Sequence, residues 1–231
     1  MRKKGLRAVV LLSGGLDSAT TLLLAKRGGY DCRSLIIDYG QRHRREIASA
    51  KKIAARAGSP SLVLTIRLPW KGSSLLDRRA SLPAGRSFSE IIRGIPSTYV
   101  PARNMILLAF AVSFAESIGA EKVFIGAHIQ DSSGYPDCRR EFIDAFQKSI
   151  RLGTRQGKTG TFGIVAPLID KTKREIIRLG LALGVPFEET WSCYRGGKRP
   201  CGRCDSCRLR ERGFRESGIP DPAGTPRRVR G

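Results

Sequence analysis

The chain has 231 residues, 41% of them hydrophobic, and a formal net charge of +22. It contains no run of about 18 apolar residues, which excludes a membrane-spanning helix, and the apolar run at 8–12 is too short for a signal peptide. We therefore expect a cytoplasmic protein with one sizeable core. The charge makes nucleic acid a candidate partner, but it is spread along the chain, so direct nucleic-acid binding is not expected to be essential.

Short apolar segments typical of buried strands alternate with longer segments typical of helices. In chain order we expect a strand at 6–12, a helix at 17–26, a strand at 34–38, a helix at 42–57, a strand at 62–66, an irregular stretch at 67–100, a well-buried helix at 102–118, a strand at 123–127, a helix at 141–150, a glycine-rich loop at 153–163, a strand at 164–168 and a helix at 171–183. The alternation predicts the α/β class, with a parallel sheet covered by helices on both faces. Ligands of such sheets bind beyond the carboxyl ends of the strands, so the loops after the first, second and fourth strands should share one rim.

The composition divides the chain into three parts. We expect an α/β domain at 1–190, a small cysteine-bearing segment at 191–215 packed on it, and a basic tail at 216–231. The tail is rich in Pro, Gly and Arg from Pro220 onward and is predicted to be disordered.

The string SGGLDS at 13–18 lies between the first strand and the first helix. Two glycines let the backbone approach a phosphate, two serines add hydroxyl donors, and the N-terminus of the helix adds its positive dipole end. No lysine follows at the spacing of a Walker loop, and the string is not GxGxxG. It therefore favours a phosphate-binding loop of another kind over an ordinary strand-to-helix turn.

This string resembles the PP-loop of ATP pyrophosphatases, which activate a substrate through an adenylated intermediate. Further motifs are DYGQRH at 38–43, TYVPARN at 98–104, SGYPDCR at 133–139, and TWSCY at 190–194 followed by CGRCDSC at 201–207. In this order they resemble the 7-cyano-7-deazaguanine synthase family over about residues 7–214. The departures from the family pattern are Leu12 for a frequent Phe, Ala102 for a common Gly, Arg140 for a frequent Pro, and the wording Gly126-Ala127-His128.

The resemblance implies a Rossmann-like fold of the adenine nucleotide alpha hydrolase type and a ligase that forms carbon–nitrogen bonds. Its reaction would convert 7-carboxy-7-deazaguanine, ammonia and ATP with Mg²⁺ into 7-cyano-7-deazaguanine, on the pathway to queuosine or archaeosine. A homodimer is a further expectation from the family.

The resemblance also implies site residues. The expected ATP-binding residues are Leu12, Ser13, Gly14, Gly15, Leu16, Asp17, Ser18, Ala19, Thr20, Thr21, Leu22, Asp38 and Arg103. The expected catalytic residues are Asp17, Asp131 and Asp137, and the expected substrate-binding residues are Ser133, Tyr135 and Asn104. The chain leaves no room for a glutaminase domain beside its core, and neither His43 nor His128 pairs convincingly with a cysteine, so free ammonia is the expected nitrogen donor.

Four of the six cysteines cluster within fifteen residues, at Cys193, Cys201, Cys204 and Cys207. Four thiolates suit tetrahedral Zn²⁺, and four protein ligands leave no open position, so one structural zinc ion per chain is expected. A [4Fe–4S] cluster is the competing interpretation, because CxxCxxC also occurs in ferredoxins. The last three cysteines cannot converge along a regular helix, so we predict a loop-like segment around the ion.

Two other functions remain open. A PP-loop enzyme that modifies tRNA, of the thiolase or lysidine-synthetase type, would use the basic charge, although thiolases usually carry paired cysteines near the active centre. A non-enzymatic zinc-containing RNA-binding protein would leave SGGLDS unexplained, and aromatic residues for base stacking are few at 7%.

Overall fold

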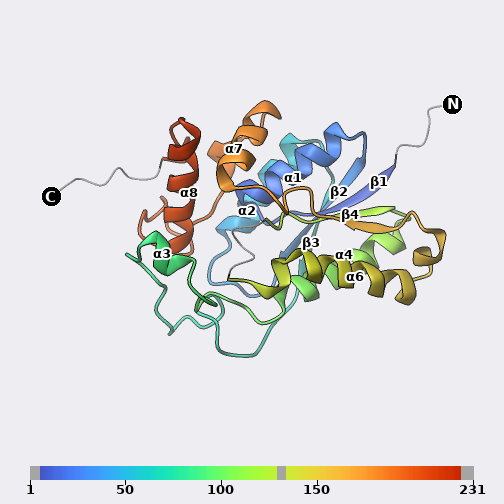
Figure 1. The fold of residues 1–231 in the computed structure, drawn as a ribbon, viewed down its shortest axis with the longest axis horizontal. Coiled ribbons are helices and arrows are strands. Elements are labelled where there is room, and N and C mark those ends of the chain that lie inside the picture. The colour runs from blue at the N-terminus through green and yellow to red at the C-terminus, as the bar shows by residue number, and fades with distance from the viewer. Residues whose placement is uncertain (1–5, 129–133, 225–231) are drawn as a thin grey trace.

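The computed structural model describes residues 6–128 and 134–224. Five parallel strands form one sheet in the order β3-β2-β1-β4-β5 (Figure 1). The strands are β1 (Arg7–Leu11), β2 (Asp31–Asp38), β3 (Ser61–Thr65), β4 (Lys122–Phe124) and β5 (Gly163–Val165). The chain runs outward from β1 to β3 and then crosses back to β4, so the strand order reverses between β1 and β4. Such a reversal opens a crevice at the carboxyl edge of the sheet, where ligands of open α/β sheets bind.

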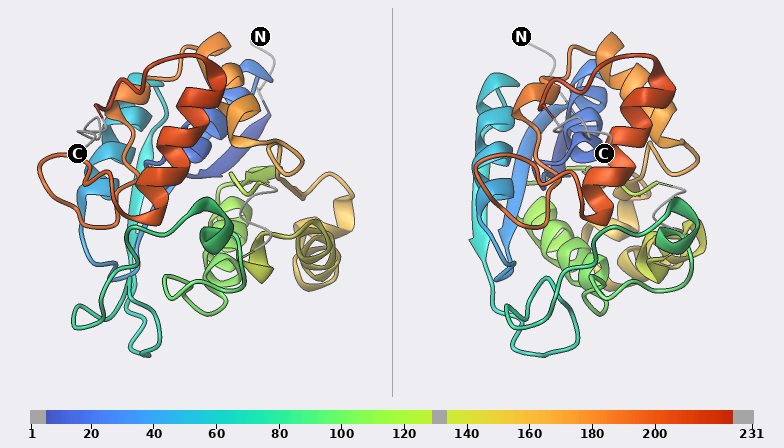
Figure 2. Two further views of the ribbon diagram at one scale, coloured as in Figure 1. Left: turned by 60° about the vertical axis from the view of Figure 1, so that its left-hand side comes forward. Right: turned by 90° about the vertical axis from the view of Figure 1, so that its left-hand side faces the viewer.

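One face of the sheet is covered by α1 (Leu16–Arg27), α2 (Arg45–Arg56) and α7 (Lys173–Ala182) (Figure 1). Alternate residues of β1, such as Ala8 and Val10, join this side of the core because side chains of a strand point to opposite faces in turn. A further helix, α8 (Asp205–Ser217), packs on α7, as both views of Figure 2 show. The C-terminal helix is thus part of the α/β domain.

The other face carries α4 (Arg103–Ser117) and α6 (Arg140–Gly153). Leu108 of α4 is fully buried there, and a side chain of that size stabilises the fold by about 1.5–3 kcal/mol. The expectation that this helix is well buried holds for one side only, because Met105 is 45% exposed and Phe110 is 37% exposed. The helix is apolar on both sides, so its composition could not distinguish the covered face from the open one.

The long connection between β3 and α4 is irregular, as predicted, except for the short helix α3 (Phe88–Ile91), which begins with a capping box. The connection lies against the cysteine segment, where Ala84 forms an isolated bridge with Cys204 and the N–H of Gly85 donates to the carbonyl of Arg203 at 3.0 Å. It ends at Ala102, whose φ of 52° places an alanine in the left-handed region before α4. The described residues also contain three 3₁₀ turns, at Pro136–Cys138, Gln156–Thr159 and Phe187–Glu189.

One prediction about the C-terminal region was wrong. The cysteine segment is not wholly loop-like, because Cys204 is the N-cap of α8 and Cys207 lies in its first turn. The described part of the predicted disordered tail, 216–224, is placed on the domain: α8 continues to Ser217, and Asp221 forms a buried ion pair with Arg210 at 2.7 Å. Residues 225–231 lie outside the described structure.

Candidate functional site

The loop at 13–18 connects β1 to α1 at the carboxyl edge of the sheet. The hydroxyl of Ser18 accepts the N–H of Ser13 at 3.2 Å and is placed to donate to the carbonyl of Gly15 at 3.1 Å, which closes the loop on itself. The carbonyl of Gly14 accepts the N–H of Trp191 at 2.9 Å, which links the loop to the cysteine segment. The N-terminus of α1 is thus held open toward the crevice, the arrangement that attracts anions.

The two glycines of the loop have different surroundings. Gly14 has a φ of 87°, and a Cβ there would lie 2.3 Å from the carbonyl oxygen of Glu46, so α2 itself requires this glycine. Gly15 has an ordinary extended conformation, and its Cβ would meet nothing closer than 3.5 Å. The protein alone would therefore accept a side chain at Gly15.

Asp17 forms the centre of a charged cluster at the start of α1. The ammonium of Lys173 donates to both carboxylate oxygens of Asp17, at 2.8 and 2.9 Å, and lies 2.8 Å from Nε2 of His128. Burial raises the pKa of Asp17, but the positive charge of Lys173 and its hydrogen bonds outweigh this effect and hold the pKa below its usual value. Asp17 is therefore a carboxylate at neutral pH, fixed in place beside a lysine.

A cavity of about 250 Å³ lies between the loop and the carboxyl ends of β1, β2 and β4. Five of the predicted ATP-binding residues line it, together with Asn104 from the predicted substrate set: Leu12, Ser13, Asp17, Ser18 and Arg103. His43 also lines it, and its Nδ1 is buried without a hydrogen-bond partner in the described structure. Burial raises the pKa of Glu46, another lining residue, to about 7, an effect that Arg103 only partly offsets. A buried polar atom without a partner is costly, and a bound polar ligand would satisfy it.

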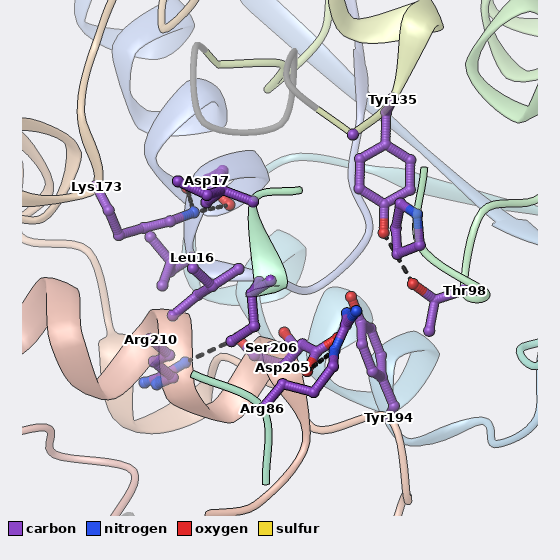
Figure 3. A pocket seen from close by; sticks show the side chains of 16 residues that line it. Leu16, Asp17, Arg86, Thr98, Tyr135, Lys173, Tyr194, Asp205, Ser206 and Arg210 are labelled. Carbon is purple, nitrogen blue, oxygen red and sulfur yellow. Dashed lines mark hydrogen bonds and ion pairs between the residues drawn. The ribbon is translucent and has the colours of Figure 1, made fainter. Parts of the chain in front are cut away.

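A second pocket, of about 120 Å³, shares Asp17 and Tyr194 with the first and is drawn in Figure 3. Its polar wall contains Arg86, Lys173 and Asp205, and its rings belong to Tyr135 and Tyr194. The hydroxyl groups of Tyr135 and Thr98 lie 3.0 Å apart and hold the Tyr135 ring at one side of the pocket (Figure 3). Of the two predicted substrate residues that the structure describes, Tyr135 and Asn104, only Tyr135 lines this pocket.

Several predicted site residues lie elsewhere. Asp137 is buried, and its Oδ2 accepts the N–H of Asn104 at 2.7 Å, so it caps the first turn of α4. Asp38 accepts the N–H of Gly40 at 3.3 Å and pairs with Arg44 at 3.2 Å, which makes it part of the turn after β2. Four predicted positions of α1 are buried and line neither described cavity: Ala19, Thr20, Thr21 and Leu22. Asp131 and Ser133 lie outside the described residues.

The four clustered cysteines are positioned to bind a metal ion, since their sulfur atoms all lie within 4.8 Å of one another. The sulfurs of Cys201 and Cys207 are 3.9 Å apart, close to the spacing of about 3.8 Å that a tetrahedron with metal–sulfur bonds of about 2.3 Å requires. The thiol of Cys204 hydrogen-bonds to Cys193, which raises the pKa of Cys204 to about 12. Hydrogen bonds from Cys204 and Cys207 in turn lower the pKa of Cys193. Without a cation the cluster therefore favours a thiolate at Cys193 and opposes ionisation of Cys204, and a bound metal ion would stabilise further thiolates.

Comparison with known proteins gives the family. The family model described as queuosine biosynthesis protein QueC matches residues 7–218. The chain belongs to the QueC family. It is 53% identical to the 7-cyano-7-deazaguanine synthase of Trichodesmium erythraeum over 94% of this chain and 99% of that protein. It is 49% identical to the synthase of the same name from Thermoplasma acidophilum, over 94% of this chain and 90% of that protein.

Among solved structures the chain is similar to that of NMN synthetase from Francisella tularensis, with 15% identity, a TM-score of 0.48, and coverage of 95% of this chain and 80% of that chain. Membership of the QueC family makes this chain an enzyme of queuosine biosynthesis that acts on small molecules. In the described part of the chain no helix is both long and apolar enough to cross a bilayer.

Sequence reasoning missed several residues that the fold brings to the site of this QueC-family chain. Lys173 lies 156 positions from Asp17, and only the packing of α7 beside α1 brings them together. Arg86 and Asp205 likewise come from the irregular connection and from α8. The signal for Lys173 was a threonine N-cap followed by a lysine at the start of an amphipathic helix, a pattern equally typical of an ordinary helix start.

Proposed function

We propose that this chain converts 7-carboxy-7-deazaguanine and ammonia into 7-cyano-7-deazaguanine, with ATP consumed to activate oxygen as a leaving group. The observation that carries the proposal is the identity of 53% with a synthase of that name, which extends over 94% of the chain. The phosphate-loop geometry beside two adjoining cavities supports it, because the reaction must bring a nucleotide and a second substrate together.

In this proposal ATP occupies the carboxyl-edge crevice. Its nucleoside lies in the cavity of about 250 Å³, where the unpartnered Nδ1 of His43 would gain a partner. Its pyrophosphate lies at the N-terminus of α1, beside Gly15, where a Cβ would meet nothing closer than 3.5 Å. Lys173 is already held beside Asp17 and supplies positive charge at this point. Mg²⁺, when bound, would neutralise further phosphate charge.

The chemistry needs two activations. The substrate carboxylate attacks the α-phosphorus of ATP, pyrophosphate leaves, and ammonia displaces AMP to give an amide and release a proton. The amide oxygen then attacks the α-phosphorus of a second ATP, pyrophosphate leaves, and loss of AMP and of both protons of the amide nitrogen gives the nitrile. The chain supplies position and charge at each step: Lys173 stabilises negative charge as it develops on the phosphate oxygens, and Asp17 fixes the orientation of Lys173.

Free ammonia is the proposed nitrogen donor. A glutaminase of the cysteine type needs a thiolate next to a histidine, and burial instead raises the pKa of Cys32 to about 11. Cys138 is buried, and its sulfur accepts the amide N–H of Asn104 at 3.0 Å. Neither arrangement provides a nucleophile for glutamine.

We further propose that the four cysteines bind one structural Zn²⁺, because four thiolates in a tetrahedron are a typical closed zinc site. A cytoplasmic location and a homodimer belong to the same proposal. The exposed apolar residues Met105 and Phe110 on α4 support association of two copies.

The test is a product assay. Purified protein is mixed with ATP, Mg²⁺, ammonium and 7-carboxy-7-deazaguanine, and the product is identified by mass spectrometry. We expect the nitrile with ammonium and none with glutamine alone. Absence of the nitrile, or an ATP-dependent change in tRNA instead, would refute the proposed function.

A further inference from the structure

The smaller pocket adjoins the nucleoside cavity at Asp17 and Tyr194, and several separate parts of the chain build it (Figure 3). The N-terminus of α1 contributes Asp17, the connection around α3 contributes Arg86 and Thr98, and the N-terminus of α8 contributes Asp205. The α3 connection is tied to the cysteine segment by the bridge between Ala84 and Cys204. The pocket is therefore formed only when the cysteine segment is in place.

An arginine–aspartate pair forms part of the wall of this pocket. Nε of Arg86 donates to Oδ1 of Asp205 at 3.2 Å, and a second bond joins the other guanidinium nitrogen to Oδ2. The Asp205 side chain is 5% exposed, whereas that of Arg86 is 28% exposed. A carboxylate has about four lone-pair sites and a guanidinium has five N–H donors, so this pair keeps unused acceptors and donors next to one another.

The remaining walls suit a flat ring. The rings of Tyr135 and Tyr194 and the apolar side chains of Ile91 and Pro96 line the pocket. Opposite the Arg86–Asp205 pair lie Lys173 and Asp17, at the end that adjoins the phosphate loop (Figure 3). The pocket thus has a hydrogen-bonding end, apolar sides and a cationic end.

We propose that this pocket binds the pyrimidinone ring of the guanine-like acid and that Asp205 and Arg86 determine its specificity. A guanine-type edge presents two donors, the 2-amino group and N1–H, beside one acceptor, the 6-oxo group. The acceptors of Asp205 face the two donors, and Arg86 donates to the 6-oxo group. The carboxylate at the other end of the ring then points toward Lys173 and the phosphate loop, where it is activated. This assignment rests on the proposed function.

The first test compares two acids on the wild-type protein: 7-carboxy-7-deazaguanine and the analogue that lacks its 2-amino group. Without that group one acceptor of Asp205 stays buried and unpaired, so we expect kcat/KM or the binding constant to fall by roughly 10- to 100-fold. Equal use of the two acids would overturn the proposal.

The second test uses variants. Asp205→Asn should raise the KM for 7-carboxy-7-deazaguanine by roughly 10- to 100-fold and leave the KM for ATP within about twofold. The preference of this variant for 7-carboxy-7-deazaguanine over the analogue that lacks the 2-amino group should fall to about threefold or less. Arg86→Gln should also raise the KM for the acid. This substitution lies outside α8, so it does not alter the sequence next to the metal ligands. Asp170→Asn is the matched control, because Asp170 pairs with Arg140 on the surface and lines neither described cavity. We expect no change in that variant.

Metal content and urea unfolding are measured for each variant, because Asp205 follows Cys204 directly. If Asp205→Asn loses metal, its kinetics do not test the pocket. The comparison of the two acids on wild type and the KM values of Arg86→Gln then decide whether the pocket binds the ring. A rise in the KM for ATP in place of the acid would overturn the proposal and assign the pocket to the nucleotide. Calorimetry without ATP measures binding of the acid to wild type and to Arg86→Gln, and so tests the pocket separately from the reaction. If wild type binds the acid but forms no nitrile, the proposed reaction is refuted and the proposed pocket is not.

Discussion

At the scale of single residues, the two adjacent glycines of the loop at 13–18 are required for different reasons: Gly14 by the protein's own packing and Gly15 by the proposed phosphate. Gly14 is required by the backbone of α2, which a Cβ would approach to 2.3 Å, whereas a Cβ at Gly15 would make only ordinary contacts, the nearest at 3.5 Å. We predict that Gly15→Val folds normally but loses ATP binding and turnover, because its side chain fills the space proposed for phosphate oxygens. Gly14→Ala should lower the free energy of unfolding by several kcal/mol, through the clash and a positive φ.

Urea unfolding and calorimetric ATP binding separate the two outcomes. Gly14→Ala is the control, because its effect on turnover should come from lost stability alone. Normal turnover by Gly15→Val would mean that phosphate does not bind over this residue.

Glu46 gives a prediction about pH. Burial raises its pKa from 4.5 to about 7 in the folded protein, so between these values the unfolded chain binds fewer protons than the folded one. The free energy of unfolding therefore falls as pH rises through this window. Glu46→Gln has no group that titrates at this position, so its free energy of unfolding should not show this fall. Between pH 4.5 and pH 8 the free energy of unfolding of Glu46→Gln should therefore rise relative to that of wild type by on the order of 3 kcal/mol.

The measurement is urea unfolding of the unliganded protein at both pH values. Glu90→Gln is a useful control because hydrogen bonds from Ser87 lower the pKa of Glu90, so its effect has the opposite sign. A pH-independent difference between Glu46→Gln and wild type would contradict the assignment.

At the scale of elements, α8 is the helix that begins within the metal site. Cys204→Ala removes its N-cap residue and leaves three thiolates. We predict loss of zinc and of soluble protein, since Trp191 and the loop it bonds to would lose their anchor. Elemental analysis should find one zinc per wild-type chain and none in the variant. Cys32→Ala, at a buried cysteine outside the cluster, should retain the metal. Iron with a visible absorption band would contradict the zinc assignment.

Element prediction worked where apolar periodicity was long and glycine or proline marked the ends. All five strands and the helices α1, α2, α4, α6 and α7 were anticipated, although the helix predicted at 42–57 begins at Arg45 and the strand predicted at 164–168 ends at Val165. The sequence did not reveal α8, because it is rich in arginine and its first turn carries cysteine ligands. Its apolar stripe is short, and its burial depends on α7.

The site was predictable only in part, for a related reason. The loop at 13–18 and the cysteine set are contiguous strings, so a function could be predicted for each before the fold is known. Lys173, Arg86 and Asp205 reach the site through tertiary packing of distant segments. Asp137 belongs to a contiguous string too, and the fold adds a contact that the string did not predict, because its carboxylate caps α4.

At the scale of the whole molecule, the C-terminal segment is fastened by one buried ion pair. Arg210 and Asp221 are 4% and 7% exposed, and Arg210 also donates to Thr190 at 2.7 Å. A chain that stops after Ile219 leaves Arg210 buried without its carboxylate, so it should be less stable than a chain that stops after Gly224 by about 3–5 kcal/mol. Urea unfolding of the two truncated chains measures this, and Asp221→Asn in the full chain should reproduce most of the loss. Equal stability of the two chains would show that the pair contributes nothing.

The strand order also determines when the molecule can fold during its synthesis. The central strand β1 is made first, yet Ala8 pairs with Lys122, so one of its two neighbours does not exist until half of the chain has been translated. Because translation adds about 5–20 residues per second, this edge of β1 remains unpaired for several seconds before β4 is synthesised. Its apolar residues Val9 and Val10 are exposed to aggregation during that interval. Slower translation or higher expression should therefore reduce the yield of native enzyme more than its final stability would suggest.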